Sequence, residues 1–300
     1  MRATAGLRTT DRIVRAPVDR AMDLTDLLAQ AAGLLDALDP LRRARVVVAV
    51  PTFVEPDGAL TDTPSVPALT GVRFADRLAA ASGREVPVVV PDLAAAVVAE
   101  AQIGSGRGID RFLCVALGTG ANAAATRSGH LVETAYGCLG DAGHVLVEPE
   151  GPPCPCGGRG CLEAVASGWA LNREAQRIGL RGAVDLAPAA AAGDSRAHAV
   201  IERAGIALGR AISSWSALLW PETVAVAGGV AALGDLLLAP AARELIRVGP
   251  PYITSRIRVV AAQLADRATV IGAALLAGAA ESGPDQVSAA QSQPETTDTD

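Results

Sequence analysis

Apolar residues near the N-terminus follow first an extended and then a helical period. Residues 1–15 predict two extended segments joined by a polar turn near residues 10–12. Residues 46–50 form an uninterrupted apolar run, which is typical of a strand buried on both faces. Between these segments a helix is predicted over residues 24–38, ended by Pro40, because apolar residues recur there at helical spacing, at Leu27, Leu28, Ala31, Leu34, Leu35 and Leu38.

The alternation of helix and strand continues to about residue 104. The pattern predicts a short helix at 74–82, a strand at Val86–Val90 and a helix at 92–104. Strands that alternate with helices in this way indicate an α/β lobe.

A second alternating region begins at residue 111. It opens with a strand at Phe112–Leu117, a Gly-Thr-Gly turn, a second short strand and a hairpin turn at Ser128–Gly129. Residues 168–220 are predicted to be helical, and Pro221 ends the last long helix. The remaining predicted elements are a strand at Thr223–Ala227, a helix at 235–247, a strand at 257–262 and a helix at 266–280.

Composition is consistent with this layered arrangement. The chain has 300 residues, of which 50% are hydrophobic but only 3% aromatic. One or two globular domains are therefore expected, with cores built from Ala, Val and Leu between helices and sheets.

The charge pattern excludes some partners. The net charge is −6, but the segment from Glu281 to Asp300 carries five acids and no base, so the remainder is close to neutral. No basic face is expected for nucleic acid. The N-terminus has no apolar leader, and Asp92 and Asp235 interrupt the longest apolar runs, so we expect a cytoplasmic protein without a membrane span.

One short stretch carries the ligands of a metal site. Cys154, Cys156 and Cys161 fall within eight residues, separated by glycines, and His144 precedes them by ten positions. Glycines permit positive φ, so the backbone can turn around an ion, and three Cys with one His form a closed tetrahedral zinc set of the structural kind. A redox pair and coincidentally buried thiols are the alternatives. The other cysteines, Cys114 and Cys138, are expected to be inert packing residues.

Five motifs occur in the order and spacing typical of one family. They are Val90-Pro-Asp92, Leu117-Gly-Thr-Gly120, Gly140-Asp-Ala-Gly-His144, CPCGGRGCLE at 154–163, and Ala227-Gly-Gly-Val230. In this series the chain resembles the ROK family of bacterial sugar kinases and sugar-responsive repressors, and the cysteine motif followed by Leu-Glu is the most specific part.

The resemblance implies an actin-like ATPase fold with a ribonuclease-H-like core and a cleft between two α/β lobes. We expect an N-terminal lobe over 1–108, joined by a C-terminal helix at 267–281, and a larger lobe over 109–266 that contains a zinc knuckle at 144–161. Residues 282–300 are expected to be a disordered tail. A homodimer or homotetramer is the usual assembly in the family.

The resemblance also assigns roles to individual residues. Asp92 matches the catalytic base that accepts the proton of the sugar hydroxyl, although a helix N-cap is an alternative role for an Asp after a strand. Sugar contacts are expected at Ser65, Asp92, Asp141, His144 and Glu163. If zinc binds one nitrogen of His144, the other nitrogen can face the sugar.

Two glycine turns match the nucleotide side of the family's site. Gly118, Thr119 and Gly120 resemble the second phosphate loop, where small residues let backbone N–H groups approach an anion. Gly228 and Gly229 match the adenosine-side turn. The implied cofactors are structural Zn²⁺ and, for catalysis, ATP with Mg²⁺.

The chain also departs from the family pattern. The first strand, with its Asp-x-Gly-Gly-Thr phosphate loop, is expected to be missing, Pro91 stands where the family has Asn, and Asp141 replaces a Glu. The sequence therefore supports two hypotheses, an ATP-dependent kinase of a hexose or related sugar and a non-catalytic sugar-binding or regulatory member. A DNA-binding repressor is disfavoured, because no helix-turn-helix domain precedes residue 45.

Overall fold

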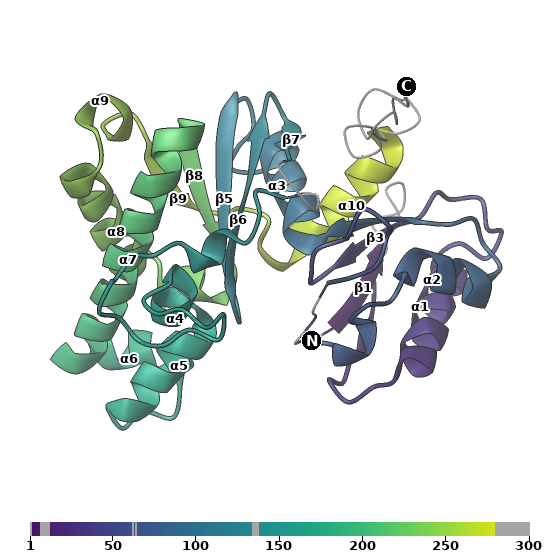
Figure 1. The fold of residues 1–300 in the computed structure, drawn as a ribbon, viewed down its shortest axis with the longest axis horizontal. Helices are drawn as coiled ribbons and strands as arrows, with labels where there is room; N and C mark the ends of the chain where they lie inside the picture. The colour runs from purple at the N-terminus through teal and green to yellow at the C-terminus, as the bar shows by residue number, and fades with distance from the viewer. Residues whose placement is uncertain (1, 7–12, 62, 64, 134–137, 280–300) are drawn as a thin grey trace, which may run out of the picture. The chain divides into compact units, whose positions relative to one another are not determined.

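The computed structural model describes residues 2–6, 13–61, 63, 65–133 and 138–279 (Figure 1). Contacts divide these residues into two units. Unit 1 comprises the residues up to Ala96, Glu133 and the residues from Thr269 on, and unit 2 comprises Val97–Val132 and Cys138–Ala268. The division falls inside a helix between Ala96 and Val97, whereas the sequence predicted a boundary at residue 108.

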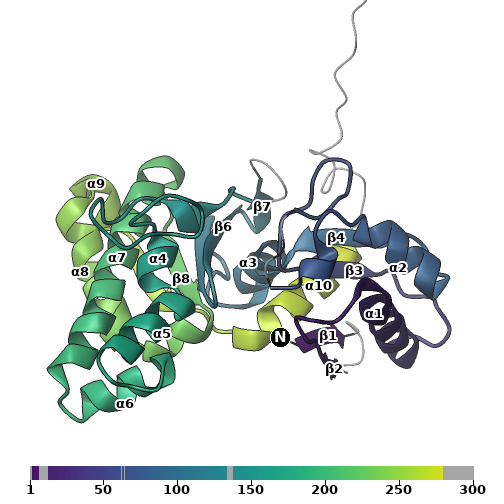
Figure 2. The same ribbon diagram turned by 60° about the horizontal axis from the view of Figure 1, so that its bottom comes forward.

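Unit 1 contains two small sheets and the helices that cover them. Strands β1 (Arg2–Gly6) and β2 (Ile13–Pro17) pair antiparallel, and β3 (Val47–Val50) and β4 (Val88–Pro91) pair parallel. Helix α1 (Leu24–Leu38) lies beside the β1–β2 pair and packs against α2 (Phe74–Ser82) (Figure 2). The buried core of this unit is formed by Leu27, Leu28, Val50, Leu60, Val66, Leu69, Phe74 and Leu78.

Helices α3 (Asp92–Ile103) and α10 (Ala268–Ala279) carry the chain between the two units. Within unit 1 they touch backbone to backbone, since a Cβ on Gly272 of α10 would overlap the carbonyl of Ala95 on α3. Thr269 Oγ1 also donates a hydrogen bond to the carbonyl oxygen of Asp92 at 3.5 Å. The start of α3 is therefore held by α10.

Unit 2 is built on a five-stranded mixed sheet with the order β7-β6-β5-β8-β9. Strands β5 (Arg111–Leu117), β6 (Ala121–Arg127) and β7 (His130–Val132) form an antiparallel meander. Strands β8 (Thr223–Ala227) and β9 (Arg258–Ala261) continue the sheet in parallel with β5. The carboxyl ends of β5, β8 and β9 therefore lie at one edge.

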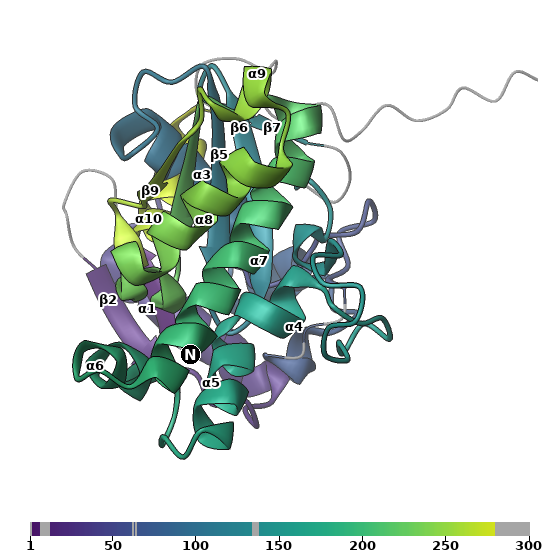
Figure 3. The same cartoon turned by 90° about the vertical axis from the view of Figure 1, so that its left-hand side faces the viewer.

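Helices α7 (Ser195–Leu219) and α8 (Asp235–Val248) run side by side across one face of this sheet (Figure 3). They approach closely because glycines face the contact, and a Cβ on Gly205 would lie 2.6 Å from the Leu237 carbonyl oxygen. Alternate residues of β5, Leu113, Val115 and Leu117, belong to the core on this face. The face is closed by small side chains, as the low aromatic content predicts.

Three shorter helices, α4 (Leu162–Ala166), α5 (Gly168–Arg177) and α6 (Leu186–Ala191), precede α7, and α9 (Pro251–Thr254) follows α8. The helical stretch predicted over 168–220 consists of three helices, α5, α6 and α7, and the last and longest ends before Pro221 as predicted. Helix α9 was not predicted.

The buried carboxylate of Glu100 ties α3 to the segment that precedes α10. Glu100 is 1% exposed and accepts hydrogen bonds from Ser105 N at 2.9 Å and Ser105 Oγ at 2.7 Å. It also accepts hydrogen bonds from Gln263 N at 3.2 Å and Leu264 N at 2.6 Å. This single side chain joins the two connecting segments within unit 2, close to where each leaves the unit.

Two details of the predicted strands are wrong. The strand predicted from Val86 begins at Val88, and Val86 is 62% exposed. The expectation that residues 46–50 are buried on both faces also fails, because only Val50 is fully buried in the two-stranded sheet. The predicted turn at 10–12 and the predicted disordered tail lie outside the described residues. No described helix combines the length and apolar character needed to cross a membrane.

Candidate functional site

Two glycine turns meet at the carboxyl edge of the unit 2 sheet. Gly118–Gly120 connects β5 to β6, and Gly228 follows β8, the parallel neighbour of β5. Gly228 has φ +87°, and a Cβ there would overlap the Leu117 carbonyl. The close approach and the positive φ both require glycine at 228. The turns predicted for phosphate and adenosine therefore lie against each other, and a backbone edge of this kind suits an anion.

The Asp141–His144 turn packs on the same edge. Its Gly143 is buried, and a Cβ there would overlap the carbonyl oxygen of Ala121, the first residue of β6. Asn122 Oδ1 accepts a hydrogen bond from Ala142 N at 3.0 Å. The turn predicted to bind sugar is thus fixed to the strand that follows the phosphate turn.

Glu163 reaches this edge from α4. Its Oε2 accepts a hydrogen bond from Ala121 N at 3.0 Å, and its side chain is half-buried. The carboxylate of Glu163 is therefore bonded within the fold rather than fully solvated.

The four predicted metal ligands converge on one point. The ligand atoms of His144, Cys154, Cys156 and Cys161 all lie within 4.8 Å of one another. His144 Nδ1 is 3.4 Å from Cys154 Sγ, and Cys156 Sγ is 3.7 Å from Cys161 Sγ. Tetrahedral zinc with its ordinary bond lengths places ligand atoms about 3.5–3.8 Å apart. The donor set and its spacing fit Zn²⁺, and no other such group of three or more His, Cys, Asp or Glu occurs in the described part of the chain.

The thiols of this cluster have unequal environments. Desolvation by burial raises the pKa of Cys154, and it raises the pKa of Cys161 to about 12. The backbone N–H of Gly158 lowers the pKa of the exposed Cys156. The buried thiols are therefore neutral without a cation, and bound zinc would favour their thiolate forms.

The second nitrogen of His144 has a neighbour on its own turn. His144 Nε2 lies 3.3 Å from Asp141 Oδ2, while Nδ1 faces the cysteines. A carboxylate behind a metal-bound histidine orients the ring and strengthens the ligand. Asp141 is thus placed to support the metal ligand, in addition to the sugar contact predicted for it.

Asp92 and Ser65 belong to unit 1. Asp92 is the first residue of α3, directly after β4, and its side chain is exposed. Surrounding protein displaces part of its hydration, and this desolvation raises the pKa of Asp92 above its ordinary value, against the opposing effect of the N–H groups of Leu93 and of Asp92 itself. Ser65 is exposed in a turn before Pro67.

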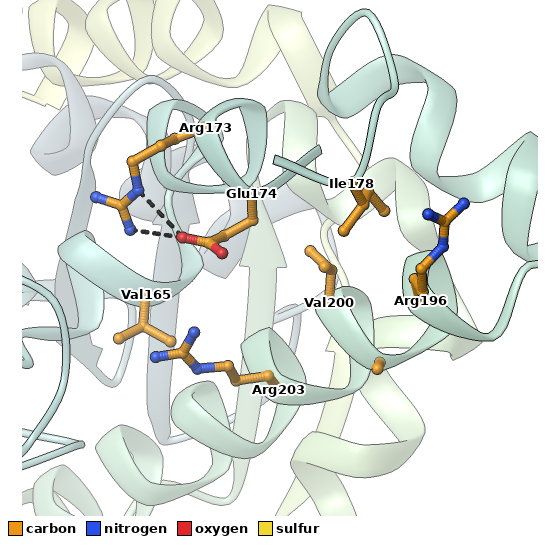
Figure 4. Close-up of a pocket in the computed structure, with 8 residues that line it drawn as sticks. Val165, Arg173, Glu174, Ile178, Arg196, Val200 and Arg203 are labelled. Atoms are coloured by element: carbon orange, nitrogen blue, oxygen red, sulfur yellow. Dashed lines mark hydrogen bonds and ion pairs between the residues drawn. The ribbon is translucent and has the colours of Figure 1, made fainter. Parts of the chain in front are cut away.

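A separate pocket of about 320 Å³ lies among α4, α5 and α7 (Figure 4). Its guanidinium groups are already paired, Arg173 with Glu174 at 3.1 Å and Arg203 with Glu148 at 2.6 Å. None of the predicted site residues lines it. The lining residues are Val165, Arg173, Glu174, Ile178, Arg196, Ala199, Val200 and Arg203.

Several backbone hydrogen bonds at the carboxyl edge of the unit 2 sheet could not be recognised from the sequence. Gly168 N donates to the Gly118 carbonyl oxygen at 2.7 Å, and Ala121 N is bound by Glu163. Asn122 Oδ1 likewise bonds to the Asp141–His144 turn through Ala142 N. The glycines that permit close packing were the only available signal, and spacing alone does not say what they touch.

In unit 2 the parallel strands end at one edge of the sheet, two glycine turns lie at that edge, and three Cys and one His form a knuckle. These features define the class of the molecule, an actin-like fold of the sugar-kinase type. The ROK family model matches residues 20–280, and the chain belongs to the ROK family.

Curated relatives and solved structures agree with this assignment. The chain is 31% identical over 261 residues to a glucokinase of Thermotoga maritima, covering 81% of this chain and 82% of the relative. It is 31% identical over 280 residues to a kanosamine kinase of Amycolatopsis mediterranei, covering 87% of this chain and 85% of the relative. The crystal structure of a ROK hexokinase from Thermus thermophilus superposes with a TM-score of 0.77 at 25% identity, covering 90% of this chain and 92% of that one.

Proposed function

We propose that this protein is an ATP-dependent sugar kinase that transfers the terminal phosphoryl group of ATP to a hydroxyl of a hexose or related sugar. The observation that carries the proposal is the construction of the unit 2 edge, where one carboxylate, Glu163, is bonded to the residue after the Gly118–Gly120 turn. Relatives named as glucokinase and kanosamine kinase support the same reaction class.

The nucleotide side is assigned to the two glycine turns. The Gly118–Gly120 turn would bind phosphate oxygens through the backbone N–H groups of Thr119 and Gly120, because the Gly118 N–H bonds to the Gly120 carbonyl oxygen. Gly228 and Gly229 would lie beside the adenosine. Phosphoryl transfer depends mainly on positioning and electrostatic stabilisation, so rigid turns of this kind are what the reaction requires.

The sugar side is assigned to Ser65, Asp141, His144 and Glu163, with Asp92 as the general base. The raised pKa of Asp92 brings the carboxylate closer to the basicity that suits proton abstraction near neutral pH. Its place at the carboxyl end of a parallel strand is also typical of catalytic residues in α/β folds.

The metals would have different roles. Zn²⁺ held by His144, Cys154, Cys156 and Cys161 would fix the knuckle and so the start of α4. Mg²⁺ would enter with the nucleotide, because this ion is usually held largely by phosphate oxygens and water.

A non-catalytic sugar-binding role is the second candidate. It is favoured by Pro91, which stands before Asp92 where the family has an Asn and therefore offers no side-chain hydrogen bond. In that case the sugar contacts of unit 2 would remain useful without phosphoryl transfer.

The experiment is a screen of ATP consumption over hexoses, N-acetylhexosamines and polyols, with binding of each sugar measured in parallel. Sugar-dependent ADP formation that is lost in Asp92→Asn supports the kinase. Sugar binding without ADP formation supports the second candidate, and equal rates in both proteins would remove Asp92 as the base.

A further inference from the structure

The Glu163 carboxylate makes a contact that its predicted sugar role does not require. Its Oε2 accepts the N–H of Ala121, the residue that follows the Gly118–Gly120 turn, at 3.0 Å. Among the described residues its other carboxylate oxygen makes no hydrogen bond, so it remains for a ligand. Hydrogen bonds to a charged acceptor are stronger than neutral ones, and this one fixes the direction of the backbone as it leaves the turn.

Gly120 shows how tightly the carboxylate is seated. A Cβ at this position would lie 2.6 Å from Glu163 Oε2, well inside ordinary contact. Gly120 has no positive φ, so the absence of a side chain is explained by the carboxylate rather than by backbone conformation. Gly120 and Glu163 therefore act as a matched pair.

The opposite side of the turn is held by the next helix. Gly168 N, at the start of α5, donates to the Gly118 carbonyl oxygen at 2.7 Å, and Trp169 N donates to the Thr119 carbonyl oxygen at 3.4 Å. The carbonyls of Gly118 and Thr119 are thus directed toward α5, and the Gly120 carbonyl oxygen accepts the Gly118 N–H at 3.0 Å. Among the described residues the N–H groups of Thr119 and Gly120 have no hydrogen-bond partner, so they are left for an anion.

Glu163 is itself anchored by the knuckle. It lies two residues after Cys161, and Leu162 between them is fully buried and donates its N–H to the Val145 carbonyl oxygen at 3.0 Å. The metal cluster, the start of α4 and the Gly118–Gly120 turn form a continuous covalent and hydrogen-bonded path within unit 2.

We infer that Glu163 is a positioning residue that holds the Gly118–Gly120 turn in its phosphate-binding geometry through Ala121 N, while its second oxygen receives a sugar hydroxyl. The inference rests on the proposed kinase function for the identity of the two ligands. One side chain then links the phosphate side to the sugar side, and the knuckle sets its place.

The test compares Glu163→Ala with Glu163→Gln. A glutamine retains an oxygen that can accept the Ala121 N–H, whereas alanine does not. The first readout is amide hydrogen exchange over residues 118–122 in the ligand-free, zinc-loaded protein. The second is binding of a non-hydrolysable ATP analogue without sugar.

We expect about tenfold faster exchange and about tenfold weaker nucleotide binding in Glu163→Ala, the effect of one lost charge-assisted hydrogen bond. Glu163→Gln is expected to remain close to wild type in both measurements. Gly120→Ala should resemble Glu163→Ala, because its Cβ displaces the carboxylate. Removing zinc by chelation should also speed the exchange.

Glu202→Ala is the control, since Glu202 is a partly exposed carboxylate of α7 whose ion-pair partner is Arg243 rather than a group of the turn. It should leave the exchange of residues 118–122 unchanged. Zinc content and exchange elsewhere in unit 2 report whether each variant is folded.

Unchanged exchange and unchanged nucleotide binding in folded Glu163→Ala would overturn the inference, as would equal losses in the Ala and Gln variants. Failure of the wild-type protein to bind the nucleotide would count against the kinase proposal instead. The exchange measurement would then still decide whether Glu163 holds the turn.

Discussion

Gly272 of α10 is the position where a single methyl group tests the support of α3, the helix that begins at the proposed base Asp92. Its missing Cβ would lie 3.0 Å from the Ala95 Cα and would overlap the Ala95 carbonyl on α3, one turn after Asp92. Ala95 is fully buried, so α3 cannot easily move aside. Gly272→Ala therefore forces α10 away from the start of α3.

The size of the effect follows from two opposing contributions. Alanine in a helix interior is about 0.5–1 kcal/mol more favourable than glycine. Overpacking of a closed interface costs about 1–3 kcal/mol. We expect the free energy of unfolding of unit 1 to fall by about 1–2 kcal/mol. Because Thr269 on α10 also bonds to Asp92, kcat should fall by roughly tenfold or more, as a small misplacement of a catalytic group can cause.

Gly33→Ala is the matched control. Gly33 lies in the interior of α1, is exposed, and has no heavy atom within 4 Å of the position that a methyl group would occupy. The substitution should stabilise unit 1 by about 0.5–1 kcal/mol and leave kcat unchanged. All three tryptophans, at 169, 215 and 220, lie in unit 2, so amide exchange of peptides from α1 and α3 is the suitable assay. Equal stability of the two variants, or an unchanged kcat in Gly272→Ala, would refute the reasoning.

Three further predictions concern the metal, the base and the buried carboxylate. Metal analysis should find about one zinc per chain. The variant Cys156→Ser should lose both zinc and thermal stability, whereas Cys114→Ala, a change in the buried strand β5, should keep its zinc. A metal-free protein of full stability would contradict this prediction. Desolvation raises the pKa of Asp92, and only the ionised carboxylate can accept a proton. We therefore expect kcat/KM to fall as the pH decreases through that raised pKa. A fall in kcat/KM centred at or below the ordinary pKa of an aspartate would argue against Asp92 as the base. Glu100→Ala should lower the free energy of unfolding, measured by denaturant titration, by about 2–4 kcal/mol, because it leaves buried N–H donors unpaired. Glu100→Gln should lower it less, since glutamine keeps an acceptor oxygen. An equal loss in the two variants would show that the acceptor oxygen is unimportant.

The sequence predicted the elements whose pattern is local. Neighbouring residues determine the helical spacing of apolar residues in α1, the apolar run of β5 and the end of α7 before Pro221. All three predicted features are confirmed. The four ligands of the metal cluster were also predicted, since three of them lie in one short glycine-rich turn. Helix α9 has only four residues, which is too short for a periodic signal.

Contacts between distant residues could not be predicted in the same way. Glu163 reaches Ala121 across 42 positions, and Glu100 reaches Leu264 across 164. The sequence shows that a carboxylate is present but not which N–H groups surround it once the sheet has formed. Likewise, the sequence does not show that Asn122 Oδ1 accepts the N–H of Ala142, 20 positions away.

Transfer of a labelled terminal phosphoryl group from ATP to sugar tests the central claim most directly. The measurement uses the sugar found in the screen and compares the wild-type protein with Asp92→Asn under conditions where both bind that sugar. We predict labelled sugar phosphate from the wild-type protein and a rate lower by roughly a hundredfold or more in Asp92→Asn, as expected for loss of a general base. Sugar binding by the wild-type protein without any labelled product, or equal rates in the two proteins, would contradict the account.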